Sequence, residues 1–296
     1  MIFGKKAEVG WFMDIHWYPG HMAKARRQVK EDLRLADVVI EVLDARIPAS
    51  SRNPDIGKIA GSKPRLIVLN KSDLADPVLT GRWMDYFKKA GYEAADVDSV
   101  SGRGVREIPG LVEQLAAPKI ASLANAGRRP RAARCMVLGI PNVGKSFLIN
   151  KLVGRRVVKT GSSPGVTRGK QWVRLTGNLE LMDTPGILRP RLDDPVTAFH
   201  LAVTGAVKEE VFNLEKVAGR LLKWLMENYP DAIRERYRLE DLPEEPEEML
   251  NAIGARRGYF MSGGAVDLIR SSRAVLKEFR EGKMGRFTLE KPPQSI

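Results

Sequence analysis

The stretch RCMVLGIPNVGKSFLINKLVG, residues 134–154, restricts the fold more than any other part of the chain. An apolar run leads into the pattern G-x-x-x-x-G-K-S and an amphipathic segment follows, which predicts a strand, a loop and a helix. Gly139 and Gly144 allow backbone N–H groups to wrap around phosphates, and the dipole of the following helix strengthens the attraction. Lys145 is expected to reach the β- and γ-phosphates, and the Ser146 hydroxyl to bind Mg²⁺. The pattern therefore predicts a nucleotide site.

Two downstream segments extend the predicted phosphate site. MDTPG, residues 182–186, follows a predicted strand, which places Asp183 to hold magnesium through water and the Gly186 N–H to face a γ-phosphate. In the intervening SSPGVTRG, Thr167 is the natural second hydroxyl ligand of Mg²⁺. Taken alone, DTPG is also compatible with an ordinary turn and Thr167 with a polar loop; their spacing behind a phosphate loop favours the switch interpretation. The predicted phosphate-binding residues are Pro141, Asn142, Val143, Gly144, Lys145, Ser146, Phe147 and Gly186.

The segment NKSD, residues 70–73, predicts which base is bound. An aspartate can accept hydrogen bonds from guanine N1–H and N2–H₂, whereas adenine presents an acceptor at N1. Asp73 is placed for that contact, Asn70 for holding the base edge, and Lys71 for covering the ring with its aliphatic stem. At the end of the next strand, Ser99, Val100 and Ser101 are expected to supply a backbone N–H to guanine O6. GTP and GDP are the predicted ligands.

The motifs occur in an unusual order: base reader, second base loop (99–101), phosphate loop, threonine switch and DTPG switch, or G4-G5-G1-G2-G3. Strands alternating with helices predict an α/β fold with a doubly wound, mostly parallel sheet, and the motif order predicts a circularly permuted Ras-like P-loop GTPase domain. We expect an extension over residues 1–12, this domain over 13–194 and an all-helical domain over 195–296, with 118–134 as a connecting segment. The permutation makes the DTPG switch lead directly into the C-terminal helices, so nucleotide state can bias how they are held.

Composition favours a soluble protein with a polyanionic partner. The net charge is +13 and the pI about 9.9, and lysine and arginine gain affinity by releasing counterions from phosphate backbones. No apolar run reaches membrane-spanning length, and the N-terminus lacks a signal-peptide core. The single Cys135 excludes an internal disulfide, so a reducing, cytoplasmic location is expected. Basic residues fall on one stripe of the predicted last helix, as an RNA contact or merely a solvated face: Arg270, Arg273, Lys277 and Arg280.

The chain resembles the YlqF/RbgA-type ribosome-assembly GTPases of bacteria. The resemblance runs over nearly the whole chain, through WYPGHMAKARR (17–27), DARIP (44–48), NKSD, GIPNVGKS, PGVTRG and DTPG, and WYPGHMAKA is its most specific part. It implies GTP hydrolysis coupled to late maturation of the large (50S) ribosomal subunit and stimulated by that subunit. It also implies a C-terminal helical domain that touches ribosomal RNA. We expect a monomer.

This sequence lacks the glutamine that usually orients the attacking water in Ras-like enzymes. Ras-like enzymes orient the attacking water with a glutamine directly after the DxxG glycine, and here that position is Ile187. The resemblance implies that His21 of the PGHM loop orients or deprotonates the water, with a structural or RNA-facing role as the alternative. Asn142 resembles the asparagine that binds K⁺ in cation-dependent GTPases, and simple loop chemistry is its alternative. The predicted catalytic residues are His21, Lys145, Thr167 and Gly186.

Two other functions remain open at this stage. One is a nucleotide-gated scaffold that binds ribosomal RNA and hydrolyses little GTP, which Ile187 keeps possible. The other is a permuted GTPase of small-subunit assembly. Relatives of that kind typically carry zinc-binding cysteine clusters or a β-barrel RNA module, neither of which this chain, with its one cysteine, is expected to contain.

Overall fold

The chain forms two compact units. The computed structural model describes residues 27–129, 131–154, 172–175, 179–182 and 194–293. Of these, the residues up to 182 and those from 287 onward form one unit, which we call the sheet unit, and residues 194–286 form the other, the helical unit. Each unit is described by itself below.

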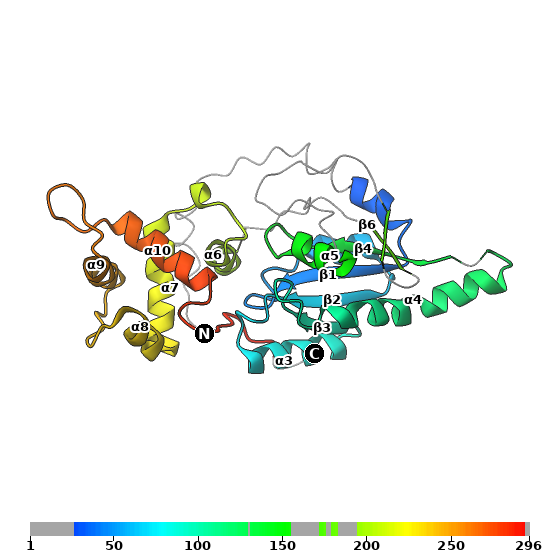
Figure 1. The fold of residues 1–296 in the computed structure, drawn as a ribbon, viewed down its shortest axis with the longest axis horizontal. Coiled ribbons are helices and arrows are strands. Elements are labelled where there is room, and N and C mark those ends of the chain that lie inside the picture. The colour runs from blue at the N-terminus through cyan, green and yellow to red at the C-terminus, as the bar shows by residue number, and fades with distance from the viewer. Residues whose placement is uncertain (1–26, 130, 155–171, 176–178, 183–193, 294–296) are drawn as a thin grey trace. The chain divides into compact units, whose positions relative to one another are not determined.

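A six-stranded sheet organises the sheet unit (Figure 1). Its order is β3-β2-β1-β4-β6-β5, in which neighbouring strands pair in parallel except for β5 with β6, which are antiparallel. Strands β5 and β6 therefore form an antiparallel pair at the edge of the sheet. The strands are β1 (Val38–Asp44), β2 (Arg65–Asn70), β3 (Glu93–Val97), β4 (Ala133–Leu138), β5 (Trp172–Arg174) and β6 (Leu179–Met182).

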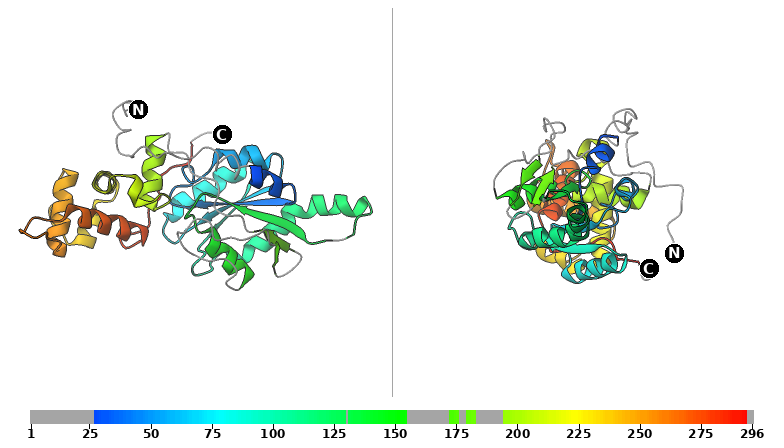
Figure 2. Two further views of the ribbon diagram at one scale, coloured as in Figure 1. Left: turned by 90° about the horizontal axis from the view of Figure 1, so that it is seen from above. Right: turned by 90° about the vertical axis from the view of Figure 1, so that its right-hand side faces the viewer.

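Helices cover both faces of this sheet (Figure 2). Residues 27–33, α2 (Pro54–Ala60) and α3 (Pro77–Lys89) lie on one face, and α4 (Ile108–Asn125) and α5 (Lys145–Val153) lie on the other, with the 3₁₀ turn η2 (Val105–Glu107) leading into α4. The starts of α2 and α3 follow from capping chemistry. The side chains of Asn53 and Asp76 accept hydrogen bonds from Asp55 N and Leu79 N, and a proline follows in the first turn of each helix.

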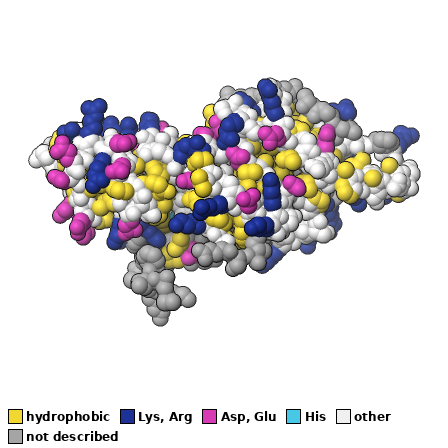
Figure 3. All heavy atoms as spheres, turned by 90° about the horizontal axis from the view of Figure 1, so that it is seen from below, with side chains coloured by type: hydrophobic (Ala, Val, Ile, Leu, Met, Phe, Trp, Pro, Cys, Tyr) yellow, Lys and Arg dark blue, Asp and Glu magenta, His cyan; other side chains and the backbone are white. Residues whose placement is uncertain are grey.

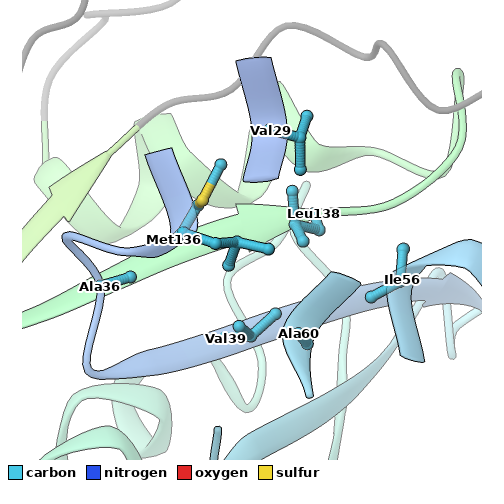
Figure 4. Packing of buried hydrophobic residues seen from close by; sticks show 8 residues of the cluster. Val29, Ala36, Val39, Ile56, Ala60, Met136 and Leu138 are labelled. Atoms are coloured by element: carbon cyan, nitrogen blue, oxygen red, sulfur yellow. The ribbon is translucent and has the colours of Figure 1, made fainter. Parts of the chain in front are cut away.

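The first described helix, residues 27–33, packs an apolar face against the sheet. Val29, Leu33 and Ala36 are almost fully buried, and they pack with Val39 of β1 and Met136 of β4 (Figure 4). Branched and long apolar side chains of the strands fill the space under the helix, which is what a strand covered on both sides requires. This packing supports β1 and also β4, the strand that leads to the phosphate loop.

The connecting segment predicted over residues 118–134 is wrong in its first half. Helix α4 continues through Pro118 and ends at Asn125, with Ala126 as its C-cap. Proline removes one backbone donor, but the alanine-rich sequence around it has strong helix propensity, and the helix is largely exposed beyond Ala116 so that water can satisfy the freed carbonyl. The link to β4 is therefore shorter than the sequence indicated.

The helical unit contains α6 to α10. Their bounds are α6 (Pro195–Thr204), η3 (Glu209–Val211), α7 (Leu214–Asn228), α8 (Pro230–Tyr237), α9 (Pro246–Arg257) and α10 (Leu268–Arg280). Helix α7 has an apolar stripe, since Val217, Leu221, Leu222 and Leu225 are fully buried. Helices α9 and α10 approach closely at Gly254, where an added Cβ would lie 2.3 Å from Ser271 Oγ.

Helix α10 buries one face and exposes its start. Val275, Leu276 and Phe279 are almost fully buried, whereas Ile269 is 52% exposed. A buried carboxylate also lies on this helix. Glu278 accepts hydrogen bonds from the guanidinium groups of Arg236 and Arg257, at 2.9 and 3.1 Å.

The last described residues depart from the predicted domain scheme. Residues after Arg286 belong to the sheet unit, although the sequence grouped them with the helices. In the part of the chain that the structure describes, no helix is long and apolar enough to cross a membrane.

Candidate nucleotide-binding site

The phosphate loop lies between β4 and α5, and its two signature glycines are structurally required. Gly139 has φ +153°, and an added Cβ would lie 2.5 Å from Val42 O. Gly144 has φ +95°, and a Cβ there would lie 2.1 Å from the Asn70 side-chain nitrogen. Lys145 begins α5, and its ammonium donates to Ile140 O at 2.6 Å. The loop thus wraps back on itself at a helix N-terminus, as phosphate binding requires.

The base-reading loop contacts the phosphate loop directly. Asn70 Nδ2 donates to Val143 O at 2.7 Å, and Lys71 Nζ donates to Asn142 O at 2.7 Å. On its other side, Asn70 Oδ1 accepts from the backbone N–H and the hydroxyl of Ser99, at 3.2 and 2.6 Å. One asparagine therefore links the three motifs that the sequence predicted to surround a single guanine nucleotide.

Lys71 and Asn142 hold unusual backbone conformations. Their φ angles are +60° and +62°, in the left-handed region that non-glycine residues seldom adopt. Such conformations persist where surrounding contacts over-determine them, and they concentrate at functional sites. Here the hydrogen bond from the Lys71 ammonium to the Asn142 carbonyl joins the two strained residues.

Asp44 and Arg46 belong to this site, although the sequence analysis assigned them no role. The Asp44 carboxylate receives the Arg46 guanidinium at 2.9 and 2.7 Å and the Lys71 ammonium at 2.9 Å. Burial alone would raise the pKa of Asp44, but these two cations outweigh it and hold the pKa well below its usual range. Burial in turn lowers the pKa of Lys71. An aspartate ending the apolar run DVVIEVLDA was the signal that could have revealed this network.

Asp73 is exposed, as a residue that contacts a base must be. Partial desolvation and the nearby Asp98 carboxylate raise its pKa. Donors on the base would therefore relieve an unfavourable concentration of negative charge. Asp98, also missed by the sequence analysis, accepts from the backbone N–H groups of Val100 and Ser101, at 2.8 and 3.2 Å.

The backbone N–H groups predicted to bind guanine O6 already donate to other acceptors in this structure. The Ser99 N–H donates to Asn70, and those of Val100 and Ser101 donate to Asp98. Any of the three can reach O6 only through a bifurcated hydrogen bond or by leaving its present acceptor. Val100 is 73% exposed, so its side chain does not restrict access.

Several predicted site residues lie outside the described residues: His21, Thr167, Asp183, Gly186 and Ile187. Of the predicted magnesium ligands, Ser146 is described, half-buried in the first turn of α5. Its hydroxyl at the phosphate loop suits Mg²⁺, a hard cation that prefers oxygen ligands and keeps bonds to nucleotide phosphates. Pro141 is half-buried, whereas Asn142 and Phe147 are exposed.

The basic stripe of α10 divides into two groups. The Arg280 guanidinium is already hydrogen-bonded within the helical unit. It donates to Ala202 O and Val203 O at the end of α6 and to the Glu209 carboxylate. Arg273 pairs with Glu209 at 3.2 Å but stays exposed. Arg270 and Lys277 are exposed as well, with the Arg270 guanidinium 4.5 Å from the centre of the Tyr259 ring.

The sequence of this chain is similar to those of known GTPases. Residues 134–248 match the family described as 50S ribosome-binding GTPase. Ribosome biogenesis GTPase A of Bacillus cereus is 48% identical over 95% of both chains, and the protein of that name from Thermotoga maritima is 31% identical over 93% of this chain and 94% of its own. This chain belongs to the ribosome biogenesis GTPase A family.

Solved structures agree with the family assignment. The crystal structure of GNP-bound YlqF from T. maritima superposes with a TM-score of 0.63 at 28% identity, over 92% of this chain and 100% of that one. The GDP-bound structure of TM YlqF gives 0.64 at 27% identity, over 90% and 99%. The protein is thus a GTP hydrolase of ribosome biogenesis that binds GTP and GDP and uses Mg²⁺ as its family generally does. Its fold is a circularly permuted Ras-like domain followed by helices.

Proposed function

We propose that this GTPase acts in late assembly of the large ribosomal subunit and that the subunit stimulates its hydrolysis. The observation that carries the nucleotide part is the joining of the base-reading and phosphate loops by Asn70 and Lys71. The choice of subunit is supported by the match of residues 134–248 to a family of 50S ribosome-binding GTPases. A net charge of +13 suits a partner made largely of RNA.

Residues of the phosphate site would carry out the chemistry. Lys145 neutralises charge on the β- and γ-phosphates, Thr167 and Gly186 respond to the γ-phosphate, and His21 orients the attacking water in place of the glutamine that Ile187 replaces. Ser146 and Thr167 would hold Mg²⁺ directly and Asp183 through water. Asn142 would help to hold K⁺, whose charge offsets the negative charge that develops in the transition state.

The helical unit supplies the proposed contact with ribosomal RNA. Helix α10 exposes three basic side chains, those of Arg270, Arg273 and Lys277. Arg280 instead binds backbone carbonyls at the end of α6. Figure 3 shows Lys and Arg side chains spread over one face of the described surface and interspersed with acidic ones. RNA binding would then use several separated phosphate contacts. We propose a monomer that acts in the cytoplasm, with an extension over residues 1–12, a nucleotide-binding domain over 13–194 and a helical domain that begins at 195 and ends at Arg286, where the chain returns to the sheet unit.

GTP turnover tests this proposal. Hydrolysis is measured in potassium buffer with purified large subunits, with small subunits and with neither, and repeated in sodium buffer. A large increase confined to large subunits and potassium is expected. His21→Ala should then abolish the increase while GDP binding remains intact.

A nucleotide-gated scaffold is the second candidate, favoured by Ile187 at the usual glutamine position. It predicts nucleotide-dependent binding to large subunits with no increase in turnover. Stimulation by small subunits alone would instead move the protein to small-subunit assembly and refute the first proposal.

A further inference from the structure

Residues 287–291, FTLEK, form a segment without helix or strand that we call the C-terminal strap. We propose that the strap positions the base-reading loop, so that selection of guanine by Asp73 depends on a segment more than two hundred residues away along the chain. This inference rests on the proposed guanine-reading role of NKSD. It adds a positioning element that none of the nucleotide-binding motifs contains.

The strap holds the backbone that directly follows the base-reading turn. Phe287 N donates to Leu74 O at 3.0 Å, and Thr288 Oγ1 accepts from Asp76 N at 3.1 Å. Leu74 directly follows Asp73, and its own N–H closes the turn by donating to Lys71 O at 3.0 Å. Phe287 and Thr288 are 4% and 3% exposed. Because these contacts are shielded from water, a displaced strap would leave backbone groups beside Asp73 without partners.

The same strap also holds the loop that follows β1. Thr288 Oγ1 donates to Ala45 O at 3.3 Å, and Leu289 N donates to Arg46 O at 2.8 Å. One buried hydroxyl thus connects the loop after β1 with the base-reading loop. Glu290 extends the attachment: its carboxylate accepts from the backbone N–H of Ala49 at 2.6 Å and from Ser50.

Arg46 connects the strap to residues that are predicted to bind the nucleotide. Its backbone carbonyl is held by the strap, and its guanidinium is held by Asp44, which also receives the Lys71 ammonium. Lys71 in turn donates to Asn142 of the phosphate loop. A continuous set of contacts therefore runs from the strap through the buried Arg46–Asp44 pair to Lys71 and Asn142. Apart from the bond from Trp83 Nε1 to Glu290 O, the polar contacts of the strap described above are with the loop after β1 and with the segment that follows the base-reading turn.

Base selectivity of the full-length protein tests the proposal. Inosine diphosphate lacks the exocyclic amine of guanine but keeps N1–H, so comparing its affinity with that of GDP reports on the hydrogen bond from that amine to Asp73. A hydrogen bond to a charged group is worth about 1.5–3 kcal/mol, so the unaltered protein should prefer GDP by about 10- to 100-fold. Thr288→Val removes the hydroxyl that joins the two loops. It should reduce that preference by about tenfold, chiefly by weakening GDP binding.

Matched variants separate positioning from loss of stability. Thr288→Ser keeps the hydroxyl and should restore the preference for GDP. Thr204→Val removes a hydroxyl of similar burial that donates to His200 O in the helical unit, and it should leave the preference unchanged. Glu290→Gln weakens the strap at its half-buried end without creating a cavity, and should speed release of GDP several-fold.

The outcomes distinguish this inference from the proposed function. If Thr288→Val and Glu290→Gln both bind the two nucleotides as the unaltered protein does, the strap has no positioning role. If Thr288→Val fails to fold, Glu290→Gln decides by the same comparison. If the unaltered protein itself does not prefer GDP, the assignment of Asp73 as base reader is refuted, and the strap inference with it.

Discussion

Replacing Asp44 by asparagine tests the buried ion network beneath the nucleotide site. The substitution keeps the shape of the side chain and removes its charge. Arg46 is 1% exposed and would keep its positive charge without the carboxylate that it now contacts through two nitrogens. The new amide nitrogen would also face either that guanidinium or the Lys71 ammonium, and neither of these cations can accept a hydrogen bond. We expect lower stability of the sheet unit and weaker nucleotide binding.

The magnitude follows from the burial of the pair. Removing one partner of a buried ion pair costs about 3–5 kcal/mol, and the lower end applies here because the asparagine oxygen can still accept from Arg46. A loss of about 3 kcal/mol is a large part of a domain stability of about 5–15 kcal/mol. In a domain of this size, each kcal/mol lowers the melting temperature by about 2–4 °C, so we expect a decrease of about 6–12 °C.

Thermal unfolding across pH provides the assay. The pKa of Asp44 lies below its unfolded value of 3.8, so its contribution is fully present above pH 3.8 and is lost as pH falls further. The difference in melting temperature between the two proteins should therefore hold steady at neutral and mildly acidic pH and shrink below 3.8. Asp85→Asn, at an exposed position on α3, is the control and should change little. An unchanged melting temperature for Asp44→Asn would refute the reasoning.

Three further predictions concern other groups. Lys145→Ala should weaken GDP binding by roughly two orders of magnitude or more, because loss of a buried charge partner costs about 2–5 kcal/mol; calorimetric titration would contradict this by showing equal affinity. Burial raises the pKa of Cys135 to about 12, so iodoacetamide should label this thiol only after denaturation. Mass spectrometry measures the labelling, and rapid labelling of the native protein would contradict the prediction. Burial disfavours the Glu278 carboxylate, but Arg236 and Arg257 outweigh it and lower its pKa, so Glu278→Gln should destabilise the helical unit by about 1–3 kcal/mol at pH 7. That difference should fade as pH falls below 4.5, and melting curves that differ equally at both pH values would count against it.

Much of the fold could be predicted because its signals are local. The apolar runs that became β1, β2 and β4, and the glycine loop between β4 and α5, carry their conformational preferences in adjacent residues. The errors have two causes. Pro118 is a helix breaker in isolation, yet α4 continues through it in an alanine-rich, exposed stretch, and the residues after Arg286 pack with the sheet unit although they follow the helices in sequence.

The candidate site divides in the same way. The sequence predicted Asn70, Lys71 and the phosphate loop, because each motif matches the chemistry of one part of a guanine nucleotide. It did not reveal Asp44, Arg46 or Asp98, whose roles depend on what lies opposite them across neighbouring strand ends. No spacing rule indicates that a carboxylate ending β1 will meet a lysine that follows β2.

By itself, the sequence determined the class of fold, the nucleotide and the permuted order of the motifs, because these depend on short patterns whose residues act together wherever the chain places them. Only the tertiary structure decided which distant residues support those motifs. Thr288 bonds to Ala45, 243 residues away along the chain, and that contact exists only because the chain returns to the sheet after α10. Hydrogen bonds act over about 3 Å, so a partner so remote in sequence becomes visible only once the whole unit has packed.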